Sequence, residues 1–369
     1  MPDTLKLNRL LAGIVHPQCP AIPTPQRLAR AMQEALIKQA IDQGVAVLCH
    51  EYLAASALAG RFDTDLLARL HSHAVAESAL DAHRQQCLGE VCSALTRAGI
   101  NALLFKGSAL ALSHYPHSHL RPRDDTDLLV PATHLAAVQR VLARLGFRRT
   151  TANQQSLIAH QRLYQRRDPN GCLHNLDVHW AINNRQEPNG WLGLASLRAR
   201  ATTVPALGGQ ALAPAPVDAV LIACVHLQVH HPGEIRLIWL YDIYLLVEAM
   251  TPAQHQALTM TIKRLGLAAT CRLGLGLAAW YFAAPGSALA ELVPVPLDPN
   301  ALRAPRRLQF WLGDLATLPD SATRLRYLSQ HLLPGPGYML EQAGKVSALW
   351  LPWLYLRRAG RGLGHLLRR

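Results

Sequence analysis

The stretch LLFKGSALALSHYPHSHLRPRDDTDLLV (residues 103–130) carries most of what this sequence says about fold and chemistry. It opens with a short apolar run stopped at Gly107, which predicts a buried strand. SALALSHY fits a short helix, and TDLLVP, starting at Thr126, predicts a second strand. A glycine between strand and helix lets the backbone approach a ligand closely. Ser108 and the free N–H groups of the first helical turn could then hold phosphate oxygens.

Two aspartates accompany the second predicted strand. Asp125 and Asp127 are two residues apart, so their carboxylates project from the same face of a strand. Like charges this close repel each other unless a cation lies between them or they share a proton. Mg²⁺ prefers oxygen ligands and keeps bonds for substrate phosphates. A pair of ions ~3.5–4 Å apart can clamp both oxygens of an in-line displacement, so we expect two Mg²⁺ ions here, with Mn²⁺ as a substitute.

A third carboxylate lies on a later predicted strand. HQRLYQRR (residues 160–167) and CLHNLDVHWAI (residues 172–182) predict a hairpin, because Asp168-Pro169-Asn170-Gly171 between them is a strong turn signal. Within it, Asp177 stands between two apolar residues, which we expect to face the core while Asp177 faces the cleft. A third acid suits a metal site, where it positions the acceptor-side ion or takes the acceptor's proton.

Simpler interpretations exist for each of these residues. Asp125 and Asp127 could belong to a solvated loop, and Asp177 could be an exposed strand acid. Ser108 could be a helix N-cap, and Lys106 could be an ordinary surface charge. The set becomes informative through its order along the chain.

The regions on both sides of this stretch predict helices. Residues 1–97 contain periodic apolar segments, with Thr24 before Pro25 as a helix start and Gly99 as a C-cap. We therefore expect an α+β protein. Its parts are an N-terminal helical region (1–97), a central domain with a small mixed β-sheet that contains the candidate site (98–215), a C-terminal helical region (216–345) and a basic aromatic tail (346–369). Proline and glycine make residues 183–216 resemble a linker.

The composition is that of a globular protein with an excess of positive charge. The 369 residues are 50% hydrophobic and 17% charged, and the net charge is +13. No apolar run approaches the ~20 residues that cross a bilayer, and the N-terminus lacks the features of a signal peptide. Seven scattered cysteines without a CxxC pair indicate reduced thiols. We expect a cytoplasmic protein.

The basic aromatic tail concentrates much of this charge. It carries five arginines and no acid, together with Trp350, Trp353 and Tyr355. Such a segment could contact an anionic membrane peripherally, or bind nucleic acid, or simply keep the protein soluble.

The ordered strings KGSALALSHYP, RPRDDTDLLV and LDVHW resemble the uncharacterised nucleotidyltransferases, a bacterial family of the polymerase-β nucleotidyltransferase superfamily. The resemblance covers most of residues 1–250. It includes helical flanks with HLQVHH and WLYDI, which contain His226, His230 and Asp242. The features shared with the family are Lys106, Gly107, Arg121, Asp125, Asp127, Asp177, His179 and Trp180.

The resemblance implies a role for each site residue. Asp125 and Asp127 would hold both metal ions, and Asp177 would complete the acceptor-side ion. Gly107 and Ser108 would bind the β- and γ-phosphates. The remaining expected nucleotide-binding residues are Lys106, Arg121, Arg123 and His179.

Two positions depart from the family pattern. Asp124 stands where a small residue is usual, so it could replace Asp125 as a metal ligand. Thr126 replaces an aliphatic residue. The paired histidines near Asp242 also suggest a metal site, although no HExxH string is present.

The resemblance therefore implies a Mg²⁺-dependent enzyme that transfers a nucleoside monophosphate from an NTP, ATP by abundance, to an unidentified acceptor with release of pyrophosphate. Two alternatives stay open. One is a non-catalytic nucleotide-binding regulatory protein with the same fold, and the other is a terminal transferase that modifies RNA.

Overall fold

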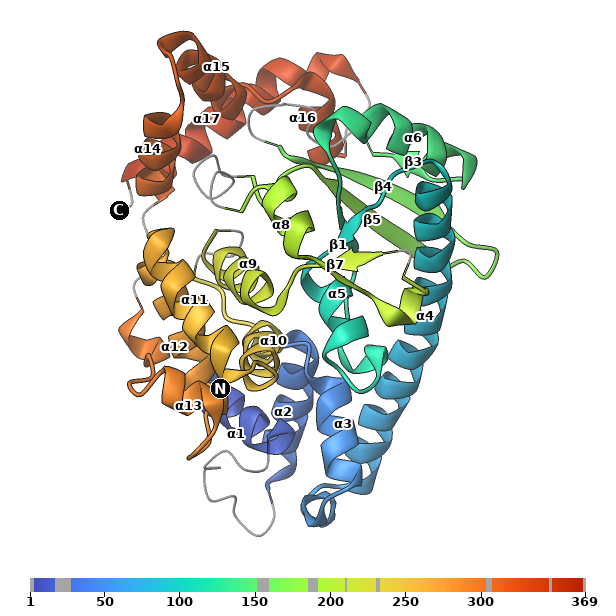
Figure 1. The fold of residues 1–369 in the computed structure, drawn as a ribbon, viewed down its shortest axis with the longest axis vertical. Helices are drawn as coiled ribbons and strands as arrows, with labels where there is room; N and C mark the ends of the chain where they lie inside the picture. The colour runs from blue at the N-terminus through green and yellow to red at the C-terminus, as the bar shows by residue number, and fades with distance from the viewer. Residues whose placement is uncertain are drawn as a thin grey trace. The chain divides into compact units, whose positions relative to one another are not determined.

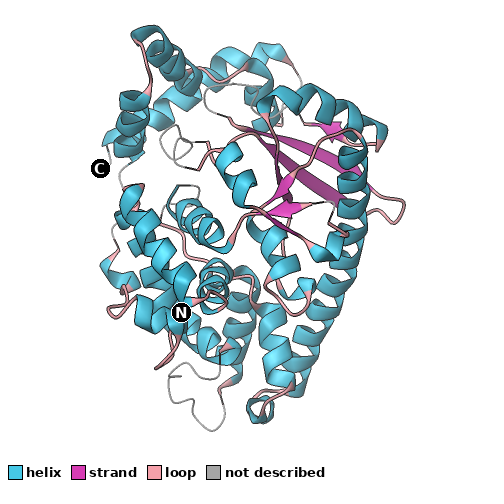
Figure 2. Cartoon of the chain, viewed as in Figure 1, coloured by secondary structure: helices cyan, strands magenta, loops and turns pink. Residues whose placement is uncertain are grey.

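The computed structural model describes residues 3–16, 28–150, 159–184, 192–209, 211–229, 233–302, 307–344 and 347–367. The chain forms two compact units. The first comprises Met1–Asp127 and Ala195–Pro305, and the second comprises Leu128–Leu194 and Arg306–Arg369. Within the described residues helices predominate, and the seven strands found there form one mixed sheet (Figures 1 and 2). This confirms the expected α+β class.

The N-terminal part of the first unit is helical, as the sequence predicts. Its elements are α1 (Thr4–Val15), α2 (Arg30–Asp42), α3 (Ala46–Ala54), the 3₁₀ turn η1 (Ala57–Arg61) and α4 (Thr64–Arg97). In Figure 1, α3 lies alongside α4. Gly99, with a left-handed φ of 73°, follows the end of α4, as expected. The predicted helix start at Thr24 lies outside the described residues.

The central stretch forms the elements that its pattern predicts. β1 (Leu103–Leu104) leads into α5 (Lys106–Ser113), and β2 (Thr126–Leu129) follows the turn η2 (Ser118–Leu120). The strands are buried throughout. The N–H of Phe105 donates to the carbonyl of Asp127 at 3.3 Å, so the end of β1 is tied to β2.

The predicted linker at 183–216 is instead partly structured. Its described residues include α8 (Leu194–Arg200), β6 (Thr202–Thr203), the turn η4 (Pro205–Leu207) and β7 (Leu212–Ala213). β7 pairs in parallel with β1, matching Leu212 with Leu103, and β6 pairs antiparallel with β7. Two-residue strands are too short to show an alternating pattern, so only Pro and Gly were visible in the sequence.

The C-terminal part of the first unit is a packed group of helices. They are α9 (Pro216–Val229), α10 (Leu237–Glu248), α11 (Pro252–Arg264), α12 (Ala268–Phe282), α13 (Ala288–Leu292) and the turn η5 (Pro299–Ala301). Close packing of α9 on α12 depends on Gly274, because a Cβ there would lie 2.7 Å from Cys224 Sγ. Thr251 and Gln254 form a capping box at the start of α11.

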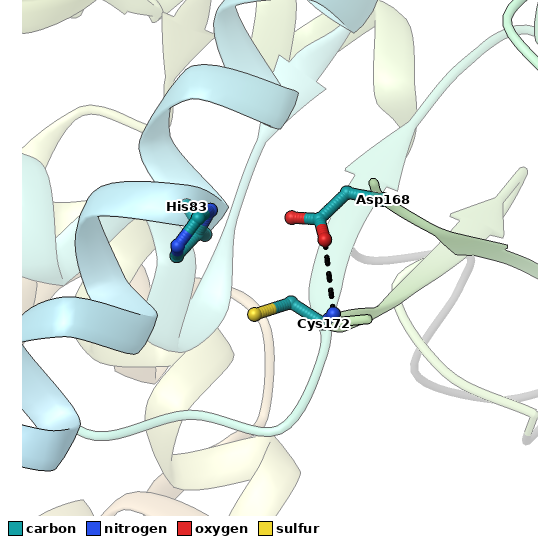
Figure 3. Close-up of side chains that lie close together, drawn as sticks. All are labelled: His83, Asp168 and Cys172. Atoms are coloured by element: carbon teal, nitrogen blue, oxygen red, sulfur yellow. Dashed lines mark hydrogen bonds between the residues drawn. The ribbon is translucent and has the colours of Figure 1, made fainter. Parts of the chain in front are cut away.

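The second unit contains the predicted hairpin. Its elements are η3 (Ala132–His134), α6 (Leu135–Arg144), β3 (Arg148–Arg149), β4 (Gln161–Arg167), β5 (Leu173–His179), α14 (Arg307–Thr317), α15 (Ser321–Leu332), α16 (Pro336–Gln342), η6 (Ala348–Trp350) and α17 (Leu351–Leu367). β4 and β5 pair antiparallel along their whole length. In the turn between them, the Cys172 N–H donates to Asp168 Oδ1 at 2.9 Å (Figure 3).

The order of strands in the sheet is β3-β4-β5-β2-β1-β7-β6. β2 belongs to both units, since Asp127 ends one and Leu128 begins the other. In the second unit the Val130 N–H, just after β2, donates to the His179 carbonyl at 2.9 Å. No helix in the described part of the chain combines the length and apolar character that spanning a bilayer requires.

Candidate functional site

The candidate site is a cavity of about 450 Å³ in the first unit. It opens where α5 begins and β2 begins, and α9 and α10 contribute to its wall. Of the residues expected at the site from sequence, its lining includes Lys106, Gly107, Arg121, Arg123, Asp125 and Asp127. The structure therefore brings six separated positions to one cavity.

The acids of this cavity come from the entry to β2. Asp127 lies in the strand and is buried, with 4% exposed, whereas Asp125 precedes the strand and stays exposed to the cavity. Desolvation by the surrounding protein raises the pKa of Asp125 to about 6, and the negative charge of Asp127 acts in the same direction. These hard oxygen donors could hold a divalent metal ion.

Lys106 supplies the positive charge closest to these acids. Its Nζ lies 2.8 Å from Asp127 Oδ1, with both side chains largely buried. Its backbone has φ of 54°, and among the described residues it is the one non-glycine with positive φ. Such a conformation costs roughly 1–2 kcal/mol. The strained first residue of α5 therefore directs an ammonium group at the carboxylates.

Gly107 and Ser108 occupy the start of α5, but their neighbours are protein groups. A Cβ on Gly107 would lie 2.9 Å from Arg121 Nη2, so the glycine accommodates the guanidinium of Arg121. Ser108 is 1% exposed, and its hydroxyl donates to the Asp125 carbonyl at 3.2 Å. Both residues thus hold the loop that presents the acids.

Arg121 is buried in an ion pair with α10. Its Nη2 lies 2.8 Å from Asp242 Oδ2, and Nε donates to the same carboxylate at 3.0 and 3.1 Å. The Tyr115 hydroxyl donates to Asp242 Oδ1 at 2.7 Å. Burial alone lowers the pKa of Arg121, but the Asp242 carboxylate outweighs it and holds this pKa above the ordinary value.

Arg123 is equally buried and pairs with α4. Its Nη1 lies 2.7 Å from Asp81 Oδ1, and both side chains are almost inaccessible. Ser118 and Gln85 donate hydrogen bonds to the other oxygen of Asp81. The two arginines therefore tie the loop before β2 to two different helices.

Sequence reasoning did not anticipate these partners. Asp81 lies within a polar stretch of α4, and nothing in its surroundings distinguishes it from a solvated helix residue. Asp242 was noted within WLYDI, with a metal site as one interpretation. Instead it accepts hydrogen bonds from Arg121 and Tyr115. His226 packs against Trp239 with ring centroids 5.5 Å apart, and His230 lies outside the described residues.

The second unit carries the other two expected residues on β5. Asp177 is half-buried and accepts a hydrogen bond from Gln161 Nε2 at 3.3 Å, whereas His179 is fully buried. Leu176 and Val178, beside Asp177, are buried as predicted. The hairpin thus presents Asp177 on the less buried side of its strand.

In this site, carboxylates face a cavity beside the start of a helix that begins with Lys-Gly. Such an arrangement is typical of enzymes that transfer phosphoryl or nucleotidyl groups. A model of the family described as "uncharacterised nucleotidyltransferase" matches residues 30–283, more than half of the chain. The chain belongs to this family and is a transferase of nucleotidyl groups. The resemblance noted in the sequence is confirmed.

Two solved structures align with about half of the chain. The antibiotic-resistance factor ANT(2'')-Ia aligns at 13% identity over 51% of this chain and 96% of its own, with a TM-score of 0.35. An antigenic nucleotidyltransferase-like protein from Paracoccidioides brasiliensis aligns at 17% identity over 51% and 91%, with a TM-score of 0.33. A search of curated proteins gave no match.

Proposed function

We propose that this protein transfers a nucleoside monophosphate, AMP from ATP by abundance, to an acceptor whose nucleophile is a hydroxyl, amine or phosphate oxygen. The nucleophile forms a bond to the α-phosphorus, the bond from that phosphorus to the bridging oxygen breaks, and pyrophosphate leaves. The acceptor's proton passes to a base. The observation that carries the proposal is the pairing of Asp125 and Asp127 in the cavity, where desolvation, with the repulsion of Asp127 added to it, raises the pKa of Asp125 to about 6.

These carboxylates suit Mg²⁺, with Mn²⁺ as a substitute. A cation between them would offset the repulsion and lower the pKa of Asp125 again. Asp124 is also exposed beside them, and its charge also raises the pKa of Asp125. When bound, two such ions would neutralise the triphosphate and lower the barrier to in-line displacement.

We propose Asp177 as the third carboxylate and the acceptor-side base. β5 is next to β2 in the strand order, and Asp177 projects from the less buried side of β5. Because His179 is fully buried, we assign it to fixing the strand in preference to touching the nucleotide.

The cations of the site divide into two roles. Lys106 reaches Asp127 from the cavity wall, so it is the group that can turn to the triphosphate when the acids bind a metal ion. Arg121 and Arg123 are committed to buried carboxylates. We therefore propose that both position the acidic loop, while the N–H groups at the start of α5 contact phosphate.

The test is incubation with α-labelled NTPs, Mg²⁺ and cell lysate, with release of pyrophosphate measured in parallel. We expect the wild type to label an acceptor, and Asp125→Asn/Asp127→Asn to abolish both signals. Asp65→Asn, an exposed aspartate on α4, is the matched control and should retain them. Binding of ATP without release of pyrophosphate, after a broad search of acceptors, would instead support a non-catalytic nucleotide-binding protein.

A further inference from the structure

The start of α17 and the turn before it expose an unusual group of large side chains in the second unit. The exposed fraction is 90% for Leu349, 43% for Trp350, 48% for Trp353 and 73% for Leu356. Trp350 and Trp353 contact each other edge to face, with ring centroids 5.9 Å apart. Four large apolar residues within eight positions form a local apolar patch. Such a patch on the exposed surface of a protein usually marks an interaction site.

Positive charge borders this patch. Arg357 and Arg358 follow directly and are exposed, and the guanidinium of Arg357 lies 5.0 Å from the centre of the Trp353 ring. No acidic residue follows Glu341 in the sequence. We name Leu349, Trp350, Trp353, Leu356, Arg357 and Arg358 the tryptophan–arginine surface.

The opposite side of α17 is held to the second unit, which fixes what the helix exposes. Leu354 is 5% exposed. The Tyr355 hydroxyl donates to the Pro334 carbonyl. Arg358 is exposed at the edge between the two sides of the helix, and its Nη2 donates to the His331 carbonyl at 3.1 Å. The inward side of the helix therefore already has its partners, and Trp353 and Leu356 are left facing solvent.

The segment that receives these hydrogen bonds extends the apolar character. Leu332 and Leu333, between His331 and Pro334, are 61% and 63% exposed. A second pair of exposed leucines therefore lies in the segment that α17 contacts. The exposed apolar side chains thus come from two segments of the chain and not from α17 alone.

We propose that the tryptophan–arginine surface binds the surface of an anionic lipid bilayer. Tryptophan favours the boundary between headgroups and acyl chains, and leucine gains from burial below it. Arginine next to that boundary is attracted by anionic headgroups. The six residues of the surface combine tryptophan, leucine and arginine and include no acid, which matches a negatively charged apolar layer better than a purely polar polyanion.

Vesicle co-sedimentation of the full chain tests this proposal. The probes are vesicles of phosphatidylcholine alone and of phosphatidylcholine with 30 mol% phosphatidylglycerol. We expect binding to the anionic vesicles, weakened by added salt, and little binding to the neutral ones. Trp350→Ser/Trp353→Ser should lose binding at every salt concentration. Arg357→Gln/Arg358→Gln should weaken it about thirtyfold, at about 1 kcal/mol for each basic residue near the membrane surface.

Matched controls distinguish binding by this surface from non-specific binding through charge or exposed apolar side chains elsewhere. Lys263→Gln/Arg264→Gln removes two exposed charges from α11, and Met260→Ser removes an apolar residue that is 65% exposed. Both controls should bind vesicles like the wild type, and circular dichroism should show every variant folded. Equal binding to both vesicle types, equal loss in the controls, or binding to RNA without binding to vesicles would each overturn the proposal.

Discussion

Replacing Asp242 by asparagine tests whether the buried ion pair holds the acidic loop in place. The change preserves the shape of the side chain and removes its negative charge. Arg121 would then keep a buried guanidinium without the carboxylate to which it donates its hydrogen bonds, since both side chains are less than one-tenth exposed. Tyr115 would keep an oxygen to which it can donate, so the loss falls mainly on the charge pair.

The expected cost follows from burial. Removing one partner of a buried ion pair costs about 3–5 kcal/mol, because the remaining charge stays desolvated. Asp65→Asn removes the carboxylate of the Arg30–Asp65 pair, whose side chains are 55% and 54% exposed. Such an exposed pair contributes about 0–1 kcal/mol. The two variants remove the same chemical group at opposite extremes of solvent exposure.

Hydrogen exchange at increasing urea measures this difference where it arises. Peptides covering α5 and α10 report the first unit separately from the second. We expect Asp242→Asn to lower the free energy of opening of these peptides by about 3–5 kcal/mol and Asp65→Asn to lower it by less than about 1 kcal/mol. Equal effects would refute the view that Arg121 is fixed by a desolvated carboxylate.

Further predictions concern the acids and the start of α5. Gly107→Ala should lower the rate of transfer about a hundredfold, because Arg121 is held by Asp242 and cannot move away from the new Cβ. The control is Gly89→Ala, where an added Cβ would have no neighbour within 4 Å, and it should leave the rate of transfer unchanged. The affinity for the metal ion should be about tenfold weaker at pH 5 than at pH 8. The reason is that Asp125, with its pKa raised to about 6, is protonated below that value and cannot bind the ion. An Mn²⁺ affinity that is the same at both pH values would contradict this. Removal of divalent ions by EDTA should abolish transfer, and Mg²⁺ or Mn²⁺, measured by release of pyrophosphate, should restore it.

Local signals in the sequence predicted much of the fold. The turn at Asp168–Gly171 and the flanking alternation were sufficient for the β4–β5 hairpin, and the apolar run before Gly107 was sufficient for β1. These features depend on neighbouring residues only. The strands β6 and β7 escaped prediction because two residues carry no period, and the pairing of β7 with β1 is a long-range event.

The candidate site divides in the same way. The spacing of Asp125 and Asp127 predicted them as a pair, the resemblance to the family added Lys106, and all three line the cavity. The roles of Arg121 and Arg123 could not be foreseen, since their partners Asp242 and Asp81 lie far away in sequence. An arginine beside acids predicts phosphate binding equally well whether or not a distant carboxylate neutralises it. Only the tertiary structure decides between these roles.

The most direct test of the account counts bound metal ions without requiring the acceptor. Mn²⁺ binding is followed by electron paramagnetic resonance in the presence of a non-hydrolysable ATP analogue. We predict two ions in the wild type, one in Asp177→Asn and none in Asp125→Asn/Asp127→Asn, with each variant still folded. Two ions bound by the Asp125→Asn/Asp127→Asn variant would contradict the claim that these carboxylates hold the metal ions around a triphosphate.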